Sequence, residues 1–280
     1  MQNSNQHQTL IIHLEAADTS AMLGLKVRTL FFSPLSSSPK PHLKPYSLSS
    51  PSNFCIRMSS SSASSQIIEH VVLFKVKDET EPAKVAGMMS GLNGLTSLDQ
   101  VLHLSAGPIH RNRSSMFKFT HMLHSRYSSK EDLSVYSGHP SHMSVVKELV
   151  LPICEDVMAV DWVADNISGP VVPRPGSAMR LTFMRLNEGL GDEEKEKVLG
   201  AVGEIKDCLG SLDQMTYGEN FSPARAKGFS IASIAIFPGL NELEALDSNP
   251  EVVQLQKDKV RDLLDRVIVL DYVVPPPQIC

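Results

Sequence analysis

Residues 67–165 and 177–275 of this 280-residue chain are two copies of one sequence pattern. The matched segments share apolar and turn residues, and most lie 110 positions apart: IIEHVVLFKV with SAMRLTFMRL, SLDQ from Ser97 with SLDQ from Ser211, His139-Pro140 with Asn249-Pro250, and Asp161-Trp162 with Asp271-Tyr272. A repeat of fixed spacing determines the architecture before any local pattern does. The sequence therefore predicts a tandem duplication of one fold unit.

The composition is that of an ordinary globular protein, with 42% hydrophobic residues, 20% charged residues and a formal net charge of −5. An acidic chain without a basic face argues against nucleic acid as a partner. No apolar run approaches the roughly 18–20 residues of a membrane span, which argues against a membrane partner. The four cysteines are scattered, which suits a reducing compartment. We expect no cofactor and no metal, since His139 and His142 alone make a weak metal motif.

The first 65 residues have the composition of a leader rather than of a domain. Serine and proline dominate residues 33–65, and no acidic residue occurs between Met22 and Ile68. Such a stretch buries too little apolar surface to offset its chain entropy. It is typical of an organellar transit peptide, and its serine content favours the chloroplast. A disordered tail is the alternative, and translation from Met58 would remove the leader and favour the cytosol or the peroxisome.

The apolar periodicity of the first unit alternates between strand and helix spacing. We expect strands at residues 67–76, 101–106, 116–125 and 157–163, and helices at residues 81–95, 128–136 and 143–153. Ser128 and Glu131 form a capping box for the second helix, and Gly138 and Pro140 divide that helix in two. The segment His110–Ser115 is expected to be a polar turn.

The resulting order β-α-β-β-α-β is the ferredoxin-like pattern, which leaves one face of its sheet bare. We therefore predict an α+β fold in which two such units pack sheet to sheet as a dimeric α/β barrel. The expected organisation is a leader (1–65), a first domain (66–165), a linker (166–176), a second domain (177–275) and a tail (276–280). Tethering favours pairing of the two units within one chain, and a homodimer is the alternative.

Four polar residues of the first unit are candidates for a ligand site: His70, His121, Tyr136 and His142. The two strand histidines lie on the apolar faces of their strands, and we expect them to point into the same interior. The second unit has Arg180, Ile231, Leu246 and Val252 at the corresponding positions, so barrel packing does not require the four polar residues. The sequence predicts one site per chain, with the second unit as its lid. The alternative for an inward histidine is a hydrogen-bonded core residue. The other strand and loop histidines are expected on the surface: His103, His110 and His124.

The first unit resembles the stress-response A/B barrel family of plants, a branch of the dimeric α+β barrels. The resemblance is carried by EHVVLFKV, by the FTH that ends at His121, by YSGHPSH at Tyr136–His142 and by VMAVDWV. It implies a soluble protein of the stress or defence response that is non-catalytic or binds a small apolar or aromatic ligand in its first domain.

One enzyme to which the chain is distantly similar, olivetolic acid cyclase, provides an alternative function. The resemblance places ligand-binding histidines at His70 and His121 and catalytic residues at Tyr136 and His142. The implied reaction is an intramolecular aldol condensation of a polyketide, with His142 as base and Tyr136 as donor to the enolate oxygen. A further tyrosine of that enzyme falls near Leu92, which has no hydroxyl, and this departure puts the identity of the substrate in doubt.

Overall fold

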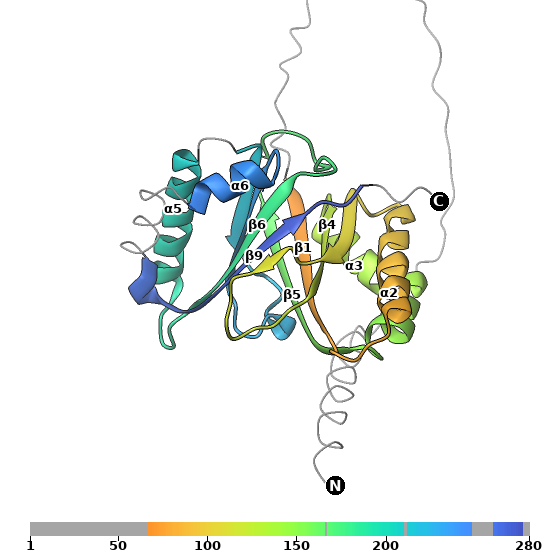
Figure 1. Cartoon of the computed structure of the whole chain (residues 1–280). Coiled ribbons are helices and arrows are strands. Elements are labelled where there is room, and N and C mark those ends of the chain that lie inside the picture. The colour runs from red at the N-terminus through yellow and green to blue at the C-terminus, as the bar shows by residue number, and fades with distance from the viewer. Residues whose placement is uncertain (1–65, 166, 210–211, 248–259, 277–280) are drawn as a thin grey trace, which may run out of the picture. The chain divides into compact units, whose positions relative to one another are not determined.

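The computed structural model describes residues 66–165, 167–209, 212–247 and 260–276 (Figure 1). The leader, and with it the expected transit peptide, lies outside these residues. So does Val252, the second-unit counterpart of His142.

The first repeat forms a four-stranded antiparallel sheet. Its strands are β1 (Ile67–Val76), β2 (His103–Pro108), β4 (His121–Tyr127) and β5 (Cys154–Ala164). They lie in the order β2-β4-β1-β5. The alternating apolar pattern predicts a strand at residues 67–76, and β1 begins and ends at these residues.

The second repeat has the same topology. Its strands are β6 (Ala178–Leu186), β7 (Gln214–Glu219), β8 (Ile231–Phe237) and β9 (Leu264–Val273). Their order β7-β8-β6-β9 repeats the order of the first sheet. The predicted α+β class and the tandem ferredoxin-like units are therefore confirmed.

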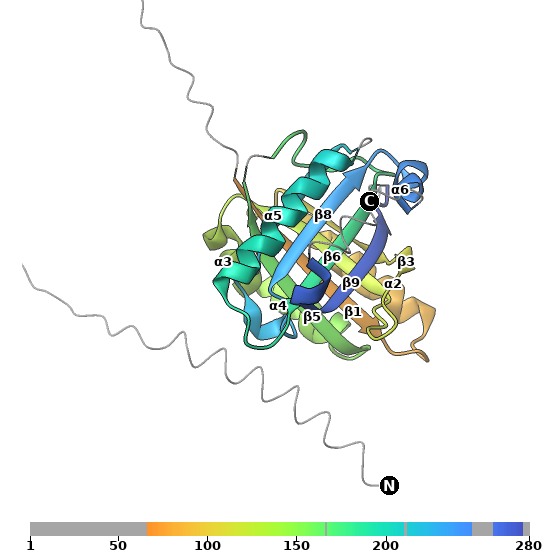
Figure 2. The same ribbon diagram turned by 90° about the vertical axis from the view of Figure 1, so that its left-hand side faces the viewer.

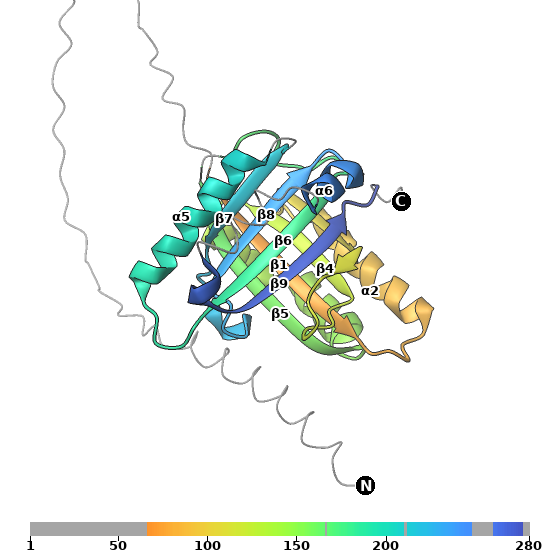
Figure 3. The same ribbon diagram turned by 60° about the vertical axis from the view of Figure 1, so that its left-hand side comes forward.

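The helices lie on the outer faces of the two sheets, as Figures 1 and 3 show. In the first repeat they are α2 (Pro82–Gly94), α3 (Lys130–Gly138) and α4 (Pro140–Val145), followed by a π-helical turn at Val146–Val150. In the second they are α5 (Asp192–Cys208), which crosses the sheet in Figure 2, and α6 (Leu240–Asp247). Three short 3-10 turns complete the described part: Leu95–Ser97, Pro223–Arg225 and Arg261–Leu263.

An apolar core drawn from both repeats lies between the two sheets. Trp162 and Leu73 of the first repeat and Phe183 and Tyr272 of the second are all fully buried in it. Burial of such large side chains is a main source of folding free energy. The sheet-to-sheet packing predicted from the bare faces is therefore confirmed within a single chain.

Each repeat also sends a short segment across to the last strand of the other. The first repeat contributes β3 (Arg111–Asn112), which pairs with β9 and becomes the edge of the second sheet. In return, the Phe221 N–H donates to the Asp161 carbonyl at 2.9 Å, next to a bridge between Trp162 and Asn220. The polar turn predicted at residues 110–115 is thus wrong in part, because its strand partner lies in the other repeat.

Two local predictions need correction. The cap of α3 is Ser129, whose hydroxyl accepts a hydrogen bond from the Asp132 N–H at 3.1 Å, and not Ser128. The third strand is predicted from residue 116, but β4 begins only at His121. The segment before it is irregular and crosses between the two sheets.

Candidate functional site

His70 lies on β1, on the face that the helices of the first repeat cover. Its Nδ1 is 2.5 Å from Oδ1 of Asp161, which is its register partner on β5. Burial alone would raise the pKa of Asp161, but the charge and hydrogen bond of His70, with a hydrogen bond from Ser222, outweigh burial and lower it. Asp161 is therefore an anion that holds the His70 ring by Nδ1, which leaves the His70 Nε2 available for a further hydrogen bond.

His142 lies on α4, and its neutral form is held in one tautomer. Its Nδ1 is 2.9 Å from the backbone carbonyl of Ser137, which can only accept a hydrogen bond. The proton of the neutral ring is therefore on Nδ1, and Nε2 carries a lone pair. Burial lowers the pKa of His142, although the bond to Ser137 opposes the effect. At neutral pH this side chain is a hydrogen-bond acceptor or a base.

Two buried tyrosines complete the cluster. The ring centroid of Tyr136, on α3, is 4.7 Å from that of His142, 5.2 Å from that of Tyr127 and 6.4 Å from that of His70. Burial raises the pKa of both tyrosines, so both hydroxyls remain protonated and can donate. We call His70, Tyr127, Tyr136 and His142, with Asp161, the histidine–tyrosine site.

The structure brings together three of the four predicted site residues. His121 lies apart, because it pairs with Phe74, four ladder positions from His70. At a rise of about 3.3 Å per residue, this separates the two histidines by about 13 Å. The His121 Nδ1 lies 2.9 Å from the Thr120 hydroxyl oxygen, and burial lowers its pKa. Both strand histidines face the helices, so the interior they share is not the space between the sheets.

The sequence reasoning missed two members of the site, Tyr127 and Asp161. Tyr127 is on the same strand face as His121, six residues further along β4. Asp161 stands out in the sequence only as part of the repeat. A register that sets β5 antiparallel to β1 would have placed its carboxylate opposite His70.

The second repeat contributes a segment that holds Asp161 in place. The Asn220 Oδ1 accepts hydrogen bonds from the backbone N–H groups of Asp161 at 3.1 Å and Ser222 at 3.0 Å. Arg225 adds a positive charge that lowers the pKa of both Asp161 and His142, after larger effects on each. In addition, the Lys130 ammonium of α3 lies 4.2 Å from the Phe221 ring centroid. The site of the first repeat is therefore completed by the second.

Replacing Asn220 with alanine is expected to lower the free energy of unfolding by about 1–3 kcal/mol, because the buried Asp161 N–H loses its acceptor. The same change is expected to shift the ¹⁵N resonances of the His70 imidazole, since the strand that carries Asp161 loses its anchor. Urea denaturation and NMR check the two effects. Asn187→Ala, at an exposed asparagine bonded to the Asp262 carbonyl, is the control and should change neither.

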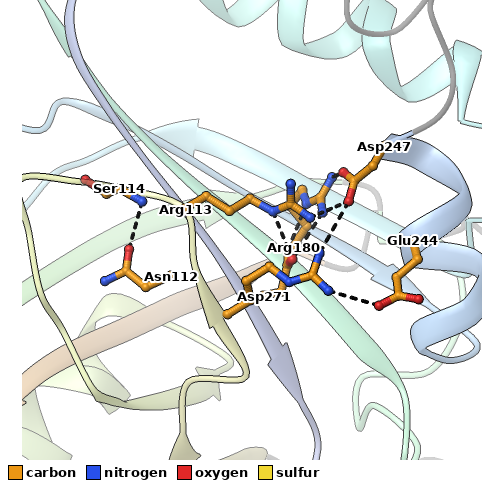
Figure 4. Close-up of polar contacts among 8 residues, drawn as sticks. Asn112, Arg113, Ser114, Arg180, Glu244, Asp247 and Asp271 are labelled. Carbon is orange, nitrogen blue, oxygen red and sulfur yellow. Dashed lines mark hydrogen bonds and ion pairs between the residues drawn. The ribbon is translucent and has the colours of Figure 1, made fainter.

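In the second repeat an arginine occupies the position of His70. Arg180 donates from Nε to Oδ1 of Asp271 at 2.8 Å, the counterpart of the pair between His70 and Asp161. Arg113 of the first repeat joins the same carboxylate at 3.0 Å (Figure 4). We call the following residues the inter-repeat ion cluster: Arg111, Arg113, Arg180, Glu244, Asp247 and Asp271. In the second repeat, the guanidinium group of Arg180 therefore takes the place of the His70 imidazole of the histidine–tyrosine site.

A second polar group lies between the two sheets. Glu69 accepts from Arg126 at 2.8 Å, from Thr216 of the second repeat at 2.8 Å, and lies 2.7 Å from the His124 Nε2. Arg126 also donates to Gln214 at 2.6 Å. Burial would raise the pKa of Glu69, but Arg126 and His124 outweigh it and lower the pKa. We call these five residues the interior polar network.

The surface placement predicted for His103 and His124 is wrong. His124 is fully buried and His103 is 7% exposed, and their ring centroids are 5.2 Å apart. Alternation along a strand marks a surface face only when one side of the sheet is open, and here the second sheet covers that side. Burial lowers the pKa of both, that of His103 to about 3. His110 is exposed.

None of the helices in the described residues is long and apolar enough to cross a bilayer. The same residues contain no group of three or more His, Cys, Asp or Glu side chains placed to hold a metal ion.

These features define a class of protein: a tandem ferredoxin-like α+β barrel with a polar site in its first repeat. The model of the stress responsive A/B barrel domain family matches the chain twice, at residues 68–164 and 179–274. The chain therefore belongs to the stress responsive A/B barrel domain family, as a tandem member.

Two Arabidopsis thaliana proteins, both described as stress-response A/B barrel domain-containing proteins, are similar over most of the chain. The first is 57% identical over 218 residues, covering 78% of this chain and 82% of the relative. The second is 46% identical over 213 residues, covering 75% of this chain and 98% of the relative. A solved anthrone oxidase-like protein has a TM-score of 0.54 at 11% identity, covering 77% of this chain and 93% of its own, and shows the fold alone.

Proposed function

We propose that the protein acts in a stress or defence response by binding a small aromatic ligand with a hydroxyl group at the histidine–tyrosine site. The single observation that carries this proposal is the hydrogen bond from His142 Nδ1 to the Ser137 carbonyl. It fixes an acceptor nitrogen beside the Tyr136 ring. A phenol could donate to that nitrogen, with the hydroxyls of the buried Tyr127 and Tyr136 behind it.

Comparison of the two repeats supports the proposal. The second repeat builds the same sheet with Arg180 and Leu246 in place of His70 and Tyr136. The polar side chains are therefore not a requirement of the fold. Buried polar groups with perturbed pKa values are more frequent at functional sites than elsewhere.

The test is a thermal melting shift with 2-naphthol as probe and naphthalene, which lacks the hydroxyl, as its comparison. We expect 2-naphthol to raise the melting temperature, since a ligand that binds only the folded state stabilises it. His142→Ala should abolish this shift. His110→Ala, at an exposed histidine, is the matched control and should retain it.

Equal shifts in the wild type and His142→Ala, or equal shifts with 2-naphthol and naphthalene, would show that the histidine–tyrosine site does not recognise the hydroxyl. The proposal would then be wrong even if some apolar binding persisted.

Catalysis of the polyketide cyclase type is a second candidate, favoured by the distance of 4.7 Å between the rings of Tyr136 and His142. His142 would remove a proton from the carbon next to a carbonyl, and a protonated tyrosine hydroxyl would donate to the enolate oxygen. Cyclisation of a linear polyketide thioester, followed by chromatography with wild type and His142→Ala, separates turnover from binding.

The cellular location is a proposal from composition alone. The leader of residues 1–65 would direct the protein to the chloroplast, and initiation at Met58 would leave it in the cytosol or the peroxisome. Mass spectrometry of the N-terminus of the protein isolated from plant tissue decides between them.

A further inference from the structure

Three sequences in the described part of the chain place an arginine three residues before a serine: Arg111–Ser114, Arg126–Ser129 and Arg174–Ser177. Serine kinases that select basic substrates bind such an arginine through carboxylates of their own, so charge pattern determines their choice of substrate. A kinase can phosphorylate such a serine only where both the arginine and the serine are accessible to it.

The structure excludes two of the three. Arg126 is fully buried in the interior polar network, and Ser129 caps α3. Ser177 is 2% exposed, and its N–H donates to the Arg174 carbonyl at 3.1 Å. Neither serine can enter the catalytic cleft of another protein without loss of local structure.

Ser114 lies in a different setting. It follows β3 in the irregular segment that leads to β4, where Ser114 is half-buried and Ser115 and Met116 are exposed. Its N–H donates to the Asn112 Oδ1 at 2.9 Å, and its side chain points away from the inter-repeat ion cluster (Figure 4). Since β3 is only two residues long, few backbone hydrogen bonds hold this segment to the second sheet.

We propose that Ser114 is a phosphorylation site for an arginine-directed serine kinase. We further propose that the kinase and the inter-repeat ion cluster compete for Arg111. The Ser114 Oγ attacks the γ-phosphorus of ATP. The new O–P bond forms as the bond to ADP breaks, and the hydroxyl proton passes to the catalytic base of the kinase. This site is independent of the histidine–tyrosine site and of the function proposed for it.

The cluster and the kinase compete for one guanidinium group. Arg111 donates to Glu244 at 3.0 Å and lies 3.6 Å from Asp247. A kinase that binds Arg111 must displace these carboxylates. The phosphate then adds a charge of about −1.5 to −2 on a side chain that points away from the inter-repeat ion cluster. Kinase binding, which draws Arg111 away from Glu244 and Asp247, is therefore the step that weakens the attachment of the first repeat to the edge of the second sheet.

The experiment uses the full chain, ATP and the catalytic subunit of cyclic-AMP-dependent protein kinase, with peptide mapping by mass spectrometry. We expect phosphate on Ser114, none on Ser129 or Ser177, and none at residues 111–118 in Ser114→Ala. Arg111→Lys should slow the reaction about tenfold, because lysine does not reproduce the arginine fork.

Glu244→Gln tests the competition, because this half-exposed carboxylate can be neutralised with little risk to folding. We expect it to raise the phosphorylation rate about threefold, an estimate for the loss of one partly exposed ion pair. Glu193→Gln, which neutralises an exposed carboxylate paired with Lys197, is the matched control and should leave the rate unchanged.

Several results would overturn the proposal: phosphate on Ser115 instead of Ser114, no phosphate on the folded chain although a peptide of residues 108–120 accepts it, or a rate that is indifferent to Arg111→Lys. An unchanged rate in Glu244→Gln would contradict the proposed competition for Arg111. Phosphorylation of Ser114 would then be unrelated to the inter-repeat ion cluster.

Discussion

Replacing Arg126 with alanine is expected to lower the free energy of unfolding by about 3–5 kcal/mol. The substitution leaves the fully buried Glu69 without its guanidinium partner, and its carboxylate then contacts only His124 and Thr216 among the described residues. It also removes the donors to Gln214 and to the Val171 carbonyl, which tie the first repeat to the second and to the linker. Guanidinium chloride denaturation measures the loss.

Two comparisons test the cause of this loss. Lys197→Ala breaks an exposed pair with Glu193 and should leave stability nearly unchanged. The double variant Glu69→Gln with Arg126→Met removes both buried charges and should recover part of the loss. A loss below about 1 kcal/mol for Arg126→Ala would mean that water reaches Glu69, and the interior polar network would then not join the repeats as described.

Acidification from pH 6.5 to pH 4.5 is expected to destabilise the protein through His103 alone, with a slope that rises from about 0.7 kcal/mol per pH unit at pH 6.5 to about 1.4 at pH 4.5. Burial, followed by the charges of His124 and Arg126, outweighs the charge of Glu69 and lowers the pKa of His103 from 6.5 to about 3. Below pH 6.5 the unfolded chain therefore binds a proton that the folded chain does not. The lowered pKa values of His124 and His142 add to the loss in the same direction.

The pH window separates the histidines from the carboxylates. Glu69 and Asp161 have lowered pKa values, so the stability that they contribute is lost only as pH falls below their unfolded values of 4.5 and 3.8. Denaturation curves collected every half pH unit should give a shallower slope for His103→Gln between pH 6.5 and pH 4.5. His110→Gln, at the surface, is the matched control. A slope that is the same for His103→Gln and the wild type would contradict the assignment.

Much of the fold could be predicted because the duplication repeats its apolar pattern. The apolar alternation of residues 67–76 predicts β1, and the bare sheet faces predict the core around Trp162 and Phe183. The crossing of Arg111–Asn112 to β9 could not be predicted, since two polar residues carry no strand pattern and the partner strand is far along the chain.

The site was predictable only in part, for a physical reason. The sequence indicates His70 by its place on an apolar strand face, and it indicates Tyr136 and His142 by the YSGHPSH stretch. Tyr127 and Asp161 join them through strand register, which sequence periodicity does not determine. His124 shows the opposite failure. The helices of the first repeat cover one face of β4 and the second sheet covers the other, whereas alternation along the strand predicts a surface side chain only if one face is open.

The exchange of short segments between the repeats has a consequence for synthesis on the ribosome. The edge that β3 pairs with belongs to β9, the last strand of the described chain to be made. While the second repeat is still being translated, the nascent first repeat therefore exposes an unpaired strand and one uncovered sheet face. Such surfaces promote association between nascent chains, and long-range pairing of this kind closes slowly. A chain built in this way is expected to depend on chaperones more than its small, regular domains suggest.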